Sequence, residues 1–256
     1  MNLLHVVSLA VIEGLTEFLP VSSTGHLVLV SNLMKLPQDE FTKTFEIFIQ
    51  LGAILAVVYL YFHQLTKTTA IWPKIIASFI PTSIMGIIFY HQIKNVLLGS
   101  TSVVLVSLSV GAIVILIAEN FLVGKKRHLV QLSQLSLFQA FVIGIFQSIS
   151  LVPGVSRSAA SIVGGLLVGL NRKSAVEYSF FIAIPTMFAA TGLDLLKTGS
   201  NLTPHQYINL LTGFVISFAT ALVSIKFLLK IVKNYSLAPF ALYRILLAVI
   251  YWKLVN

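Results

Sequence analysis

The sequence predicts an all-α polytopic membrane protein with an inverted-topology repeat, and three observations support this prediction. Of the 256 residues, 57% are hydrophobic and only 10% are charged, with a mean hydropathy of +0.95, whereas soluble domains average about 25% charged residues. Apolar runs long enough to cross a bilayer, about 17–25 residues each, recur along most of the chain. Two further apolar regions are interrupted by Pro- and Ser-rich breaks. No stretch has the composition of a separate soluble domain, so residues 1–256 are expected to form one membrane domain.

Six apolar runs are predicted to be full transmembrane spans because each is long enough to cross the hydrocarbon core as a helix. They cover residues 45–62, 75–92, 101–119, 176–196, 207–228 and 237–254.

The two interrupted regions, 1–34 and 136–171, differ from these spans. Each has a helix-length run, a break (Pro20 to Gly25, and Pro153 to Ser158) and then a second run of about 10–15 residues, which is too short to span. Non-helical backbone at membrane depth persists only where protein or a polar cavity satisfies it. We therefore expect two re-entrant helix–loop–helix regions.

The basic residues predict the orientation. If the six spans alternate in direction, ten Lys and Arg residues fall on one side and five on the other, and the richer side is expected to be cytoplasmic. Both termini then lie outside. This bias explains most of the net charge of +9, so we expect membrane lipids, and no nucleic acid, as partners.

The alternation gives the two halves, approximately residues 1–120 and 135–256, opposite orientations. The segment "EFLPVSSTG" can be laid over "SLVPGVSRS", and Glu46 falls near Glu177 in the same overlay. Inverted repeats of this kind place a shared site near the midplane, where the broken helices meet. The polar residues of the two breaks are therefore expected to face one another.

The stretch "EGLTEFLPVSSTGH", residues 13–26, is the first polar cluster. Glu13 and Glu17 are four residues apart, so a helix presents them on one face, where two buried like charges require a compensating cation. Carboxylate and hydroxyl oxygens favour Mg²⁺ or Ca²⁺, and the chain has no cysteine. The alternative is that one of the two glutamates is protonated and structural.

Three hydroxyl residues and a histidine follow in the same stretch. Ser22, Ser23 and Thr24 exceed the single side chain that a helix cap needs. His26 lies beside them and the two carboxylates, where it is a candidate nucleophile or acid–base group. The five other histidines lack such neighbours and are expected in loops or at the interface.

The second cluster is "PGVSRSAAS", in which Arg157 stands between Ser156 and Ser158. An arginine in a membrane zone is costly unless it meets an anion, and its planar fork suits phosphate. The start of the following helix offers backbone N–H groups to the same anion. Arg244 is expected to snorkel or to pair with a buried acid such as Glu177, without a role in the site.

Together the clusters favour phosphoryl transfer. Metal and arginine would neutralise the phosphate oxygens, a nucleophile would attack and an acid–base group would serve the leaving oxygen. The membrane setting favours a lipid phosphate or diphosphate as substrate. The alternatives are an inverted-repeat transporter or lipid flippase and a scaffold or small channel subunit, which would not explain both acids and the arginine.

These motifs resemble the undecaprenyl-diphosphate phosphatase family of the bacitracin-resistance type. Its first signature, Glu/Gln-x-x-x-Glu running into Pro-x-Ser-Ser-Thr-Gly-His, is matched completely by "EGLTEFLPVSSTGH". Its second, Pro-Gly-x-Ser-Arg-Ser-x-x-Thr, is matched by "PGVSRSAAS" except that Ser161 replaces threonine, which keeps the hydroxyl. The similarity extends over the whole chain.

The resemblance implies metal-dependent hydrolysis of undecaprenyl diphosphate at a site that opens to the periplasmic face of the bacterial inner membrane. It also implies recycling of the carrier lipid for peptidoglycan synthesis, cell-wall biogenesis and cell shape, and bacitracin resistance. A homodimer is left open. Glu13 and Glu17 would bind the metal or act as base, and Ser23, with Ser22, and His26 would be the nucleophile and acid–base candidates. The phosphate-binding residues would be Thr24, Ser156, Arg157, Ser158 and Ser161.

Overall fold

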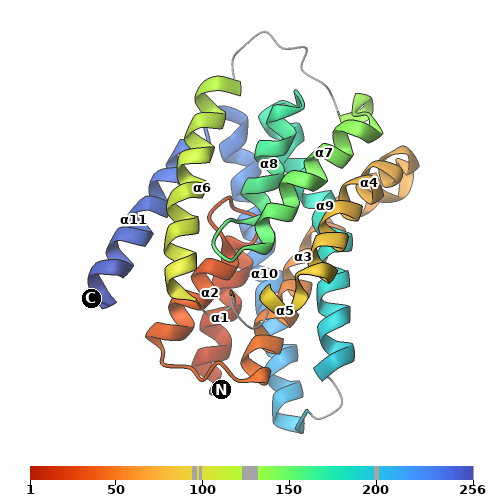
Figure 1. Ribbon diagram of the computed structural model, residues 1–256. Coiled ribbons are helices and arrows are strands. Elements are labelled where there is room, and N and C mark those ends of the chain that lie inside the picture. Colours follow the sequence, from red (N-terminus) through yellow and green to blue (C-terminus); the bar gives the residue numbers. More distant parts are fainter. Residues whose placement is uncertain (94–96, 98–99, 123–131, 199–201, 256) are drawn as a thin grey trace.

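The computed structural model describes residues 1–93, 97, 100–122, 132–198 and 202–255, and this part of the chain is helical, without strands (Figure 1). The first half contains α1 (Leu3–Thr16), α2 (Ser23–Leu33), α3 (Glu40–Lys67), α4 (Trp72–Ile88), α5 (Tyr90–Gln92) and α6 (Thr101–Leu122). The second half contains α7 (Leu137–Ser148), α8 (Arg157–Leu167), α9 (Arg172–Thr198), α10 (Pro204–Asn234) and α11 (Ala238–Val255).

Six helices are long and apolar enough to cross a membrane: α3, α4 with the short 3₁₀ turn before it, α6, α9, α10 and α11. They coincide with the six predicted spans, which confirms the helical membrane fold. The second span ends earlier than predicted, because Phe89 leaves the helical conformation and ends α4 at Ile88. Capping residues fix the N-terminal ends of two of these helices: Asp39 accepts a hydrogen bond from the Thr42 N–H at the start of α3, and Thr203 forms a capping box at the start of α10.

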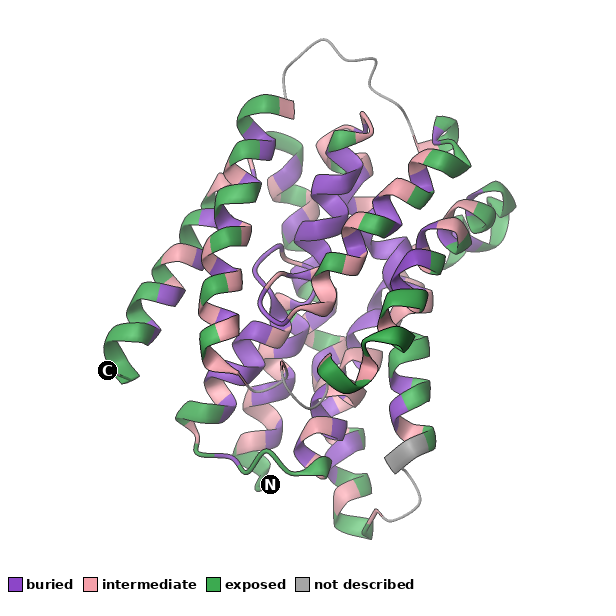
Figure 2. Ribbon diagram, in the orientation of Figure 1, coloured by how far each residue is buried: buried purple, intermediate pink, exposed green. Residues whose placement is uncertain are grey.

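Each remaining pair of short helices forms a helix–break–helix unit. In Figure 1 the α1–α2 unit starts beside the N-terminus, the α7–α8 unit starts at the opposite end, and both reverse direction near the centre. Buried residues surround the breaks in Figure 2. The helices after the breaks are capped alike: Ser22 (φ 71°) accepts from the Gly25 N–H, and Ser156 (φ 78°) accepts from the Ala159 N–H. The equivalent residues are therefore Ser22 and Ser156, one position away from the register of the sequence overlay.

A positive φ is uncommon for a serine and persists only where the surroundings hold it. Both cap residues adopt it, and each is followed by an 11-residue helix. The two breaks therefore share one local backbone design.

The short helix of each half packs against a long helix of the other half. At Gly14 of α1, an added Cβ would lie 2.4 Å from the Ser217 carbonyl oxygen of α10, and at Gly144 of α7 it would lie 2.2 Å from the Ser78 carbonyl oxygen of α4. Small residues permit such close helix–helix contact in membranes. The packing of α1 on α10 and of α7 on α4 therefore joins the two halves and aligns their breaks.

An ion pair between the buried Glu119 and the partly exposed Arg172 fixes the end of the bundle away from the N-terminus. The Arg172 guanidinium donates to the Glu119 carboxylate, with Nη2–Oε2 at 2.6 Å, and Glu119 also accepts the Leu237 N–H at 2.8 Å. This one carboxylate therefore connects α6, α9 and the start of α11. Its charge is compensated locally.

We expect Gly144→Ala to destabilise the protein by about 1–3 kcal/mol, since the new methyl group must displace backbone of α4. Thermal unfolding in detergent measures the effect. The matched control is Gly192→Ala, because a Cβ at Gly192 would meet nothing within 4 Å. Equal melting temperatures for the two variants would contradict the close packing of α7 on α4.

Candidate active site

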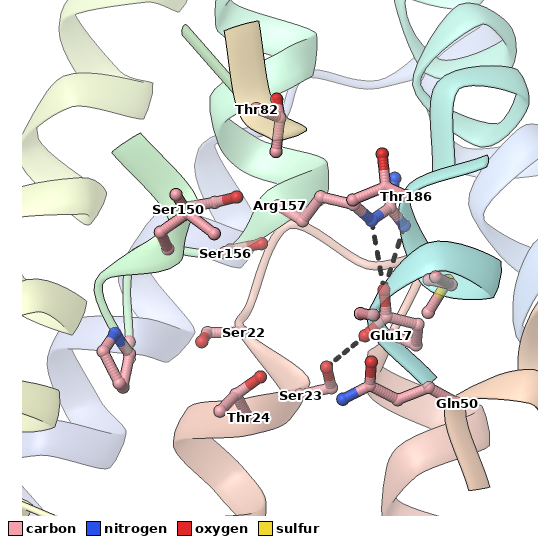
Figure 3. Close-up of a pocket in the computed structure, with 15 residues that line it drawn as sticks. Glu17, Ser22, Ser23, Thr24, Gln50, Thr82, Ser150, Ser156, Arg157 and Thr186 are labelled. Carbon is pink, nitrogen blue, oxygen red and sulfur yellow. Dashed lines mark hydrogen bonds and ion pairs between the residues drawn. The ribbon is translucent and has the colours of Figure 1, made fainter. Parts of the chain in front are cut away.

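A polar cavity of about 140 Å³ lies where the two breaks meet (Figure 3). Residues from both breaks line it, together with residues of α3, α4 and α9. The lining residues are Glu17, Ser22, Ser23, Thr24, Gln50, Thr82, Ser150, Leu151, Pro153, Gly154, Ser156, Arg157, Thr186, Met187 and Ala190. The cavity thus brings together some of the polar groups that the sequence predicted would converge, namely Glu17, Ser22, Ser23, Thr24, Ser156 and Arg157.

Glu17 is the centre of the hydrogen bonding in this cavity. Its Oε1 accepts from Arg157 Nε at 3.2 Å and from Arg157 Nη2 at 3.0 Å, and its Oε2 accepts from the Ser23 hydroxyl. The end of α1 supplies the acid, the first break supplies the serine and the second break supplies the arginine, as Figure 3 shows. All three side chains are largely buried, so the ion pair is screened little by solvent.

Arg157 is held on its other side by α9. Its Nη1 donates to the Ser179 carbonyl oxygen at 2.8 Å, and the Ser179 hydroxyl accepts from the Ser161 hydroxyl at 2.7 Å. Ser161 therefore supports the arginine from behind and does not line the cavity. Ser179 was not singled out in the sequence analysis, although it is a polar residue within the apolar run of α9.

Ser158 also faces away from the cavity. Its hydroxyl donates to the Phe18 carbonyl oxygen at 2.7 Å and so joins the second break directly to the first. Ser22 and Ser156 do line the cavity, and their hydroxyls cap α2 and α8. Thr24 lines it too.

His26 lies outside the cavity, with both ring nitrogens engaged. Nδ1 is 2.7 Å from the Ser22 carbonyl oxygen, and Nε2 is 2.7 Å from the Tyr243 hydroxyl. Because a carbonyl only accepts, Nδ1 is the protonated nitrogen and Nε2 accepts from the tyrosine. The imidazole therefore links the first break to α11.

Glu13 is fully buried, and neither carboxylate oxygen has a hydrogen-bond partner in the part of the chain that the structure describes. The charged side chains that interact with Glu13 electrostatically are Glu17, Glu46 and Arg157. An unpartnered buried carboxylate beside a second acid is a donor set that suits a hard divalent cation. Among the described residues, however, no three His, Cys, Asp or Glu side chains gather into a ready-made metal cluster.

The cavity also contains polar residues that sequence reasoning missed. Gln50, Thr82 and Thr186 come from three different spans. Gln147 of α7 donates to both threonine hydroxyls, at 3.0 and 3.1 Å. Their signal was available, since each is a polar residue within an apolar run. Their shared location depends on how the helices pack.

The expectation for Arg244 was wrong. Arg244 is fully buried, so it does not snorkel, and Glu177 pairs with Lys173 at 3.8 Å instead. The Arg244 guanidinium lies beside both breaks and donates to their backbone carbonyls.

Comparison with known proteins identifies relatives over nearly the whole chain. Residues 6–250 match the family model described as bacitracin resistance protein BacA. The chain is 49% identical to an undecaprenyl-diphosphatase of Aquifex aeolicus, over 96% of this chain and 96% of the relative. Identity is 47% to the protein of the same name from Sulfurihydrogenibium, over 98% and 99% of the two chains, and 46% to that of Thermus thermophilus, over 95% and 94%.

The matched region includes both breaks, every lining residue of the polar cavity, the first five long helices and most of α11. The chain belongs to the family described as bacitracin resistance protein BacA.

Proposed function

We propose that this multi-pass membrane protein hydrolyses undecaprenyl diphosphate to undecaprenyl phosphate and inorganic phosphate. The observation that supports this most directly is the contact of Ser23, Glu17 and Arg157 in one polar cavity between the breaks. The relatives named undecaprenyl-diphosphatase supply the substrate. A nucleophile, a base and a cation are the groups that phosphoryl transfer needs.

Ser23 is the nucleophile in this proposal. Its hydroxyl already donates to Glu17, so the carboxylate accepts the proton as the serine oxygen attacks the terminal phosphorus. The bond to the bridging oxygen breaks, and undecaprenyl phosphate leaves. Water then hydrolyses the phosphoserine, releasing phosphate and restoring the serine. Ser23 is favoured over His26 because it lines the cavity, whereas both histidine nitrogens are engaged elsewhere.

Arg157 and the two helix starts would bind the phosphate oxygens. Arg157 lines the cavity and uses only part of its five-donor fork on Glu17 and Ser179. The first turns of α2 and α8 begin at the cavity with Ser22 and Ser156. Helix N-termini favour anions through their free N–H groups. Ser158 and Ser161 contribute by holding the second break and Arg157 in place.

Glu13 and Glu17 would hold a divalent cation, Mg²⁺ or Ca²⁺. The support is the Glu13 carboxylate, which is buried without a hydrogen-bond partner among the described residues, beside a second acid. When bound, such an ion supplies positive charge to the phosphate oxygens. The chain's own part is to orient both carboxylates from α1 and the turn that follows it.

The membrane arrangement follows from the same proposal. We infer that residues 1–120 and 135–256 are inverted repeats in the inner membrane, with both termini and the opening of the site on the periplasmic face. The matching caps at Ser22 and Ser156 and the exchanged packing of α1 and α7 support the repeat. Hydrolysis there would return the carrier lipid to peptidoglycan synthesis and would confer bacitracin resistance when the protein is abundant.

Purified wild-type protein is expected to release phosphate from undecaprenyl diphosphate, to lose this activity in EDTA and to recover it with Mg²⁺ or Ca²⁺. Colorimetric phosphate release in detergent measures this. Glu17→Ala and Arg157→Ala should both abolish release, since each removes one member of the central ion pair. If the folded wild-type protein released no phosphate with any metal, this result would contradict the hydrolase proposal and favour lipid or ion transport.

Ser23→Ala should lower kcat by about 10³-fold or more, because it removes the attacking oxygen, whereas His26→Ala should lower it by only about tenfold through a lost supporting hydrogen bond. Steady-state kinetics separates the two. Ser133→Ala, at an exposed position, is the control. If His26→Ala proved as inactive as Ser23→Ala, or if phosphate were trapped on the histidine in an acid-labile, alkali-stable form, the assignment of the nucleophile would be reversed.

The orientation is tested on the natural cysteine-free background. Lys67→Cys and Lys253→Cys both place a thiol at an exposed position, and a membrane-impermeant maleimide added to intact cells should label only residue 253. Labelling of residue 67 without residue 253 would invert the topology. Labelling of both after the cells are opened confirms that each thiol is reactive.

A further inference from the structure

We propose that Tyr243 and Arg244 of α11 are positioning residues that hold the two breaks in register, so that the groups of one break face those of the other across the cavity. This inference rests on the proposed function, because it assigns these residues to the same site. Neither side chain belongs to the two motifs that resemble the phosphatase family. Both come from the last helix: Arg244 bonds both breaks directly, and Tyr243 bonds His26, which in turn bonds Ser22 of the first break.

All five N–H donors of the Arg244 guanidinium are used, and every acceptor is a backbone carbonyl. Nη1 donates to Pro20 in the first break at 3.3 Å and to Val155 in the second at 3.1 Å, and Nη2 donates to Gly154 at 2.8 Å. The two remaining donors reach α6, at Ser107 (3.0 Å) and Leu108 (3.1 Å). One rigid fork therefore connects three segments, and carbonyls that the breaks leave outside any helix gain a donor.

The burial of Arg244 is not explained by charge pairing. The side chain is fully buried, and it forms no ion pair with any carboxylate in the described part of the chain. Burying an unpaired cation is costly, so its carbonyl partners must compensate for the lost hydration. Arg157, by contrast, faces a carboxylate. Gly111 of α6 leaves space for the Arg244 guanidinium, since a Cβ at this position would lie 2.1 Å from Nη2.

Tyr243 holds the first break from the neighbouring position on α11. Its hydroxyl bonds His26 Nε2 at 2.7 Å, and His26 Nδ1 bonds the Ser22 carbonyl oxygen at 2.7 Å. The aromatic ring lines a separate apolar cavity of about 490 Å³ beside α10. The chain Tyr243–His26–Ser22 therefore fixes the residue that precedes the proposed nucleophile, Ser23.

These contacts matter for catalysis because the reacting groups come from different breaks. Ser23 lies in the first and Arg157 in the second, so their separation depends on how the breaks are joined. A misplacement of about 1 Å in such a site lowers the rate about 10²-fold. Loss of the clamp should therefore affect kcat far more than KM.

The experiment compares Arg244→Lys, Arg244→Met, Gly111→Ala and Tyr243→Phe with wild type, using undecaprenyl diphosphate and the melting temperature of each variant. Lysine has one nitrogen and cannot span both breaks, so we expect a fall in kcat of about 10²-fold for both Arg244 variants. Gly111→Ala, which displaces the guanidinium without removing it, should fall similarly. Tyr243→Phe should lose about 3- to 10-fold, the loss of one hydrogen bond.

A second readout does not depend on activity. Spin labels at Leu19→Cys and Val152→Cys, in a doubly labelled chain that keeps the wild-type melting temperature, report the distance across the two breaks by double electron–electron resonance. We expect one narrow distance distribution in wild type and a broad one in Arg244→Lys. The controls are Tyr235→Phe, which lines the same apolar cavity but is 66% exposed, and Lys253→Met at the exposed end of α11.

The outcomes separate the two proposals. An inactive wild type with a narrow distribution that broadens in Arg244→Lys would overturn the hydrolase function and leave the clamp standing. A folded Arg244→Lys with wild-type kcat, or with an unchanged distribution, would overturn the clamp. A change confined to KM or to melting temperature would also overturn it, because it would show a merely structural residue.

Discussion

The fold depends on one constraint: two stretches of non-helical backbone lie inside an apolar protein, and their N–H and C=O groups need partners. In lipid no water can supply them. Three kinds of side-chain hydrogen bond supply these partners. Serine hydroxyls cap α2 and α8, the Ser158 hydroxyl donates to the Phe18 carbonyl oxygen, and Arg244 donates to carbonyls of both breaks. The polar cavity forms beside these partners, where the remaining groups face one another.

The Glu17–Arg157 ion pair meets a similar requirement, because buried charges also need partners. An acid from the end of α1 and an arginine from the second break neutralise each other in a place where either alone would be costly. Ser23 and the Ser179 carbonyl satisfy the rest of the pair. A phosphate that entered would compete with Glu17 for the guanidinium, and the carboxylate would then be freer to accept the Ser23 proton.

Most of the architecture could be predicted from the sequence because its signals are local. Apolar length predicted the six spans, and the polar residues and prolines within apolar runs predicted the two breaks and six of the fifteen cavity-lining residues. Long-range contacts could not be predicted in this way. Arg244 lies 224 positions from the Pro20 carbonyl that it binds, and Tyr243 lies 217 from His26. Nor does sequence reveal that Ser158 and Ser161 bond backbone oxygens instead of lining the cavity.

The same contacts bear on whether the halves can rock against each other, as alternating access would require. Ser158 bonds the Phe18 carbonyl directly across the breaks, and Arg244 holds Pro20 and Gly154 with one rigid group. Rocking would break these bonds and leave buried backbone groups unsatisfied, each at a cost of about 1–3 kcal/mol. Such coupling favours a site that is preorganised for one reaction, because preorganised donors need no rearrangement as charge develops. The geometry therefore suits hydrolysis better than transport driven by motion between the repeats.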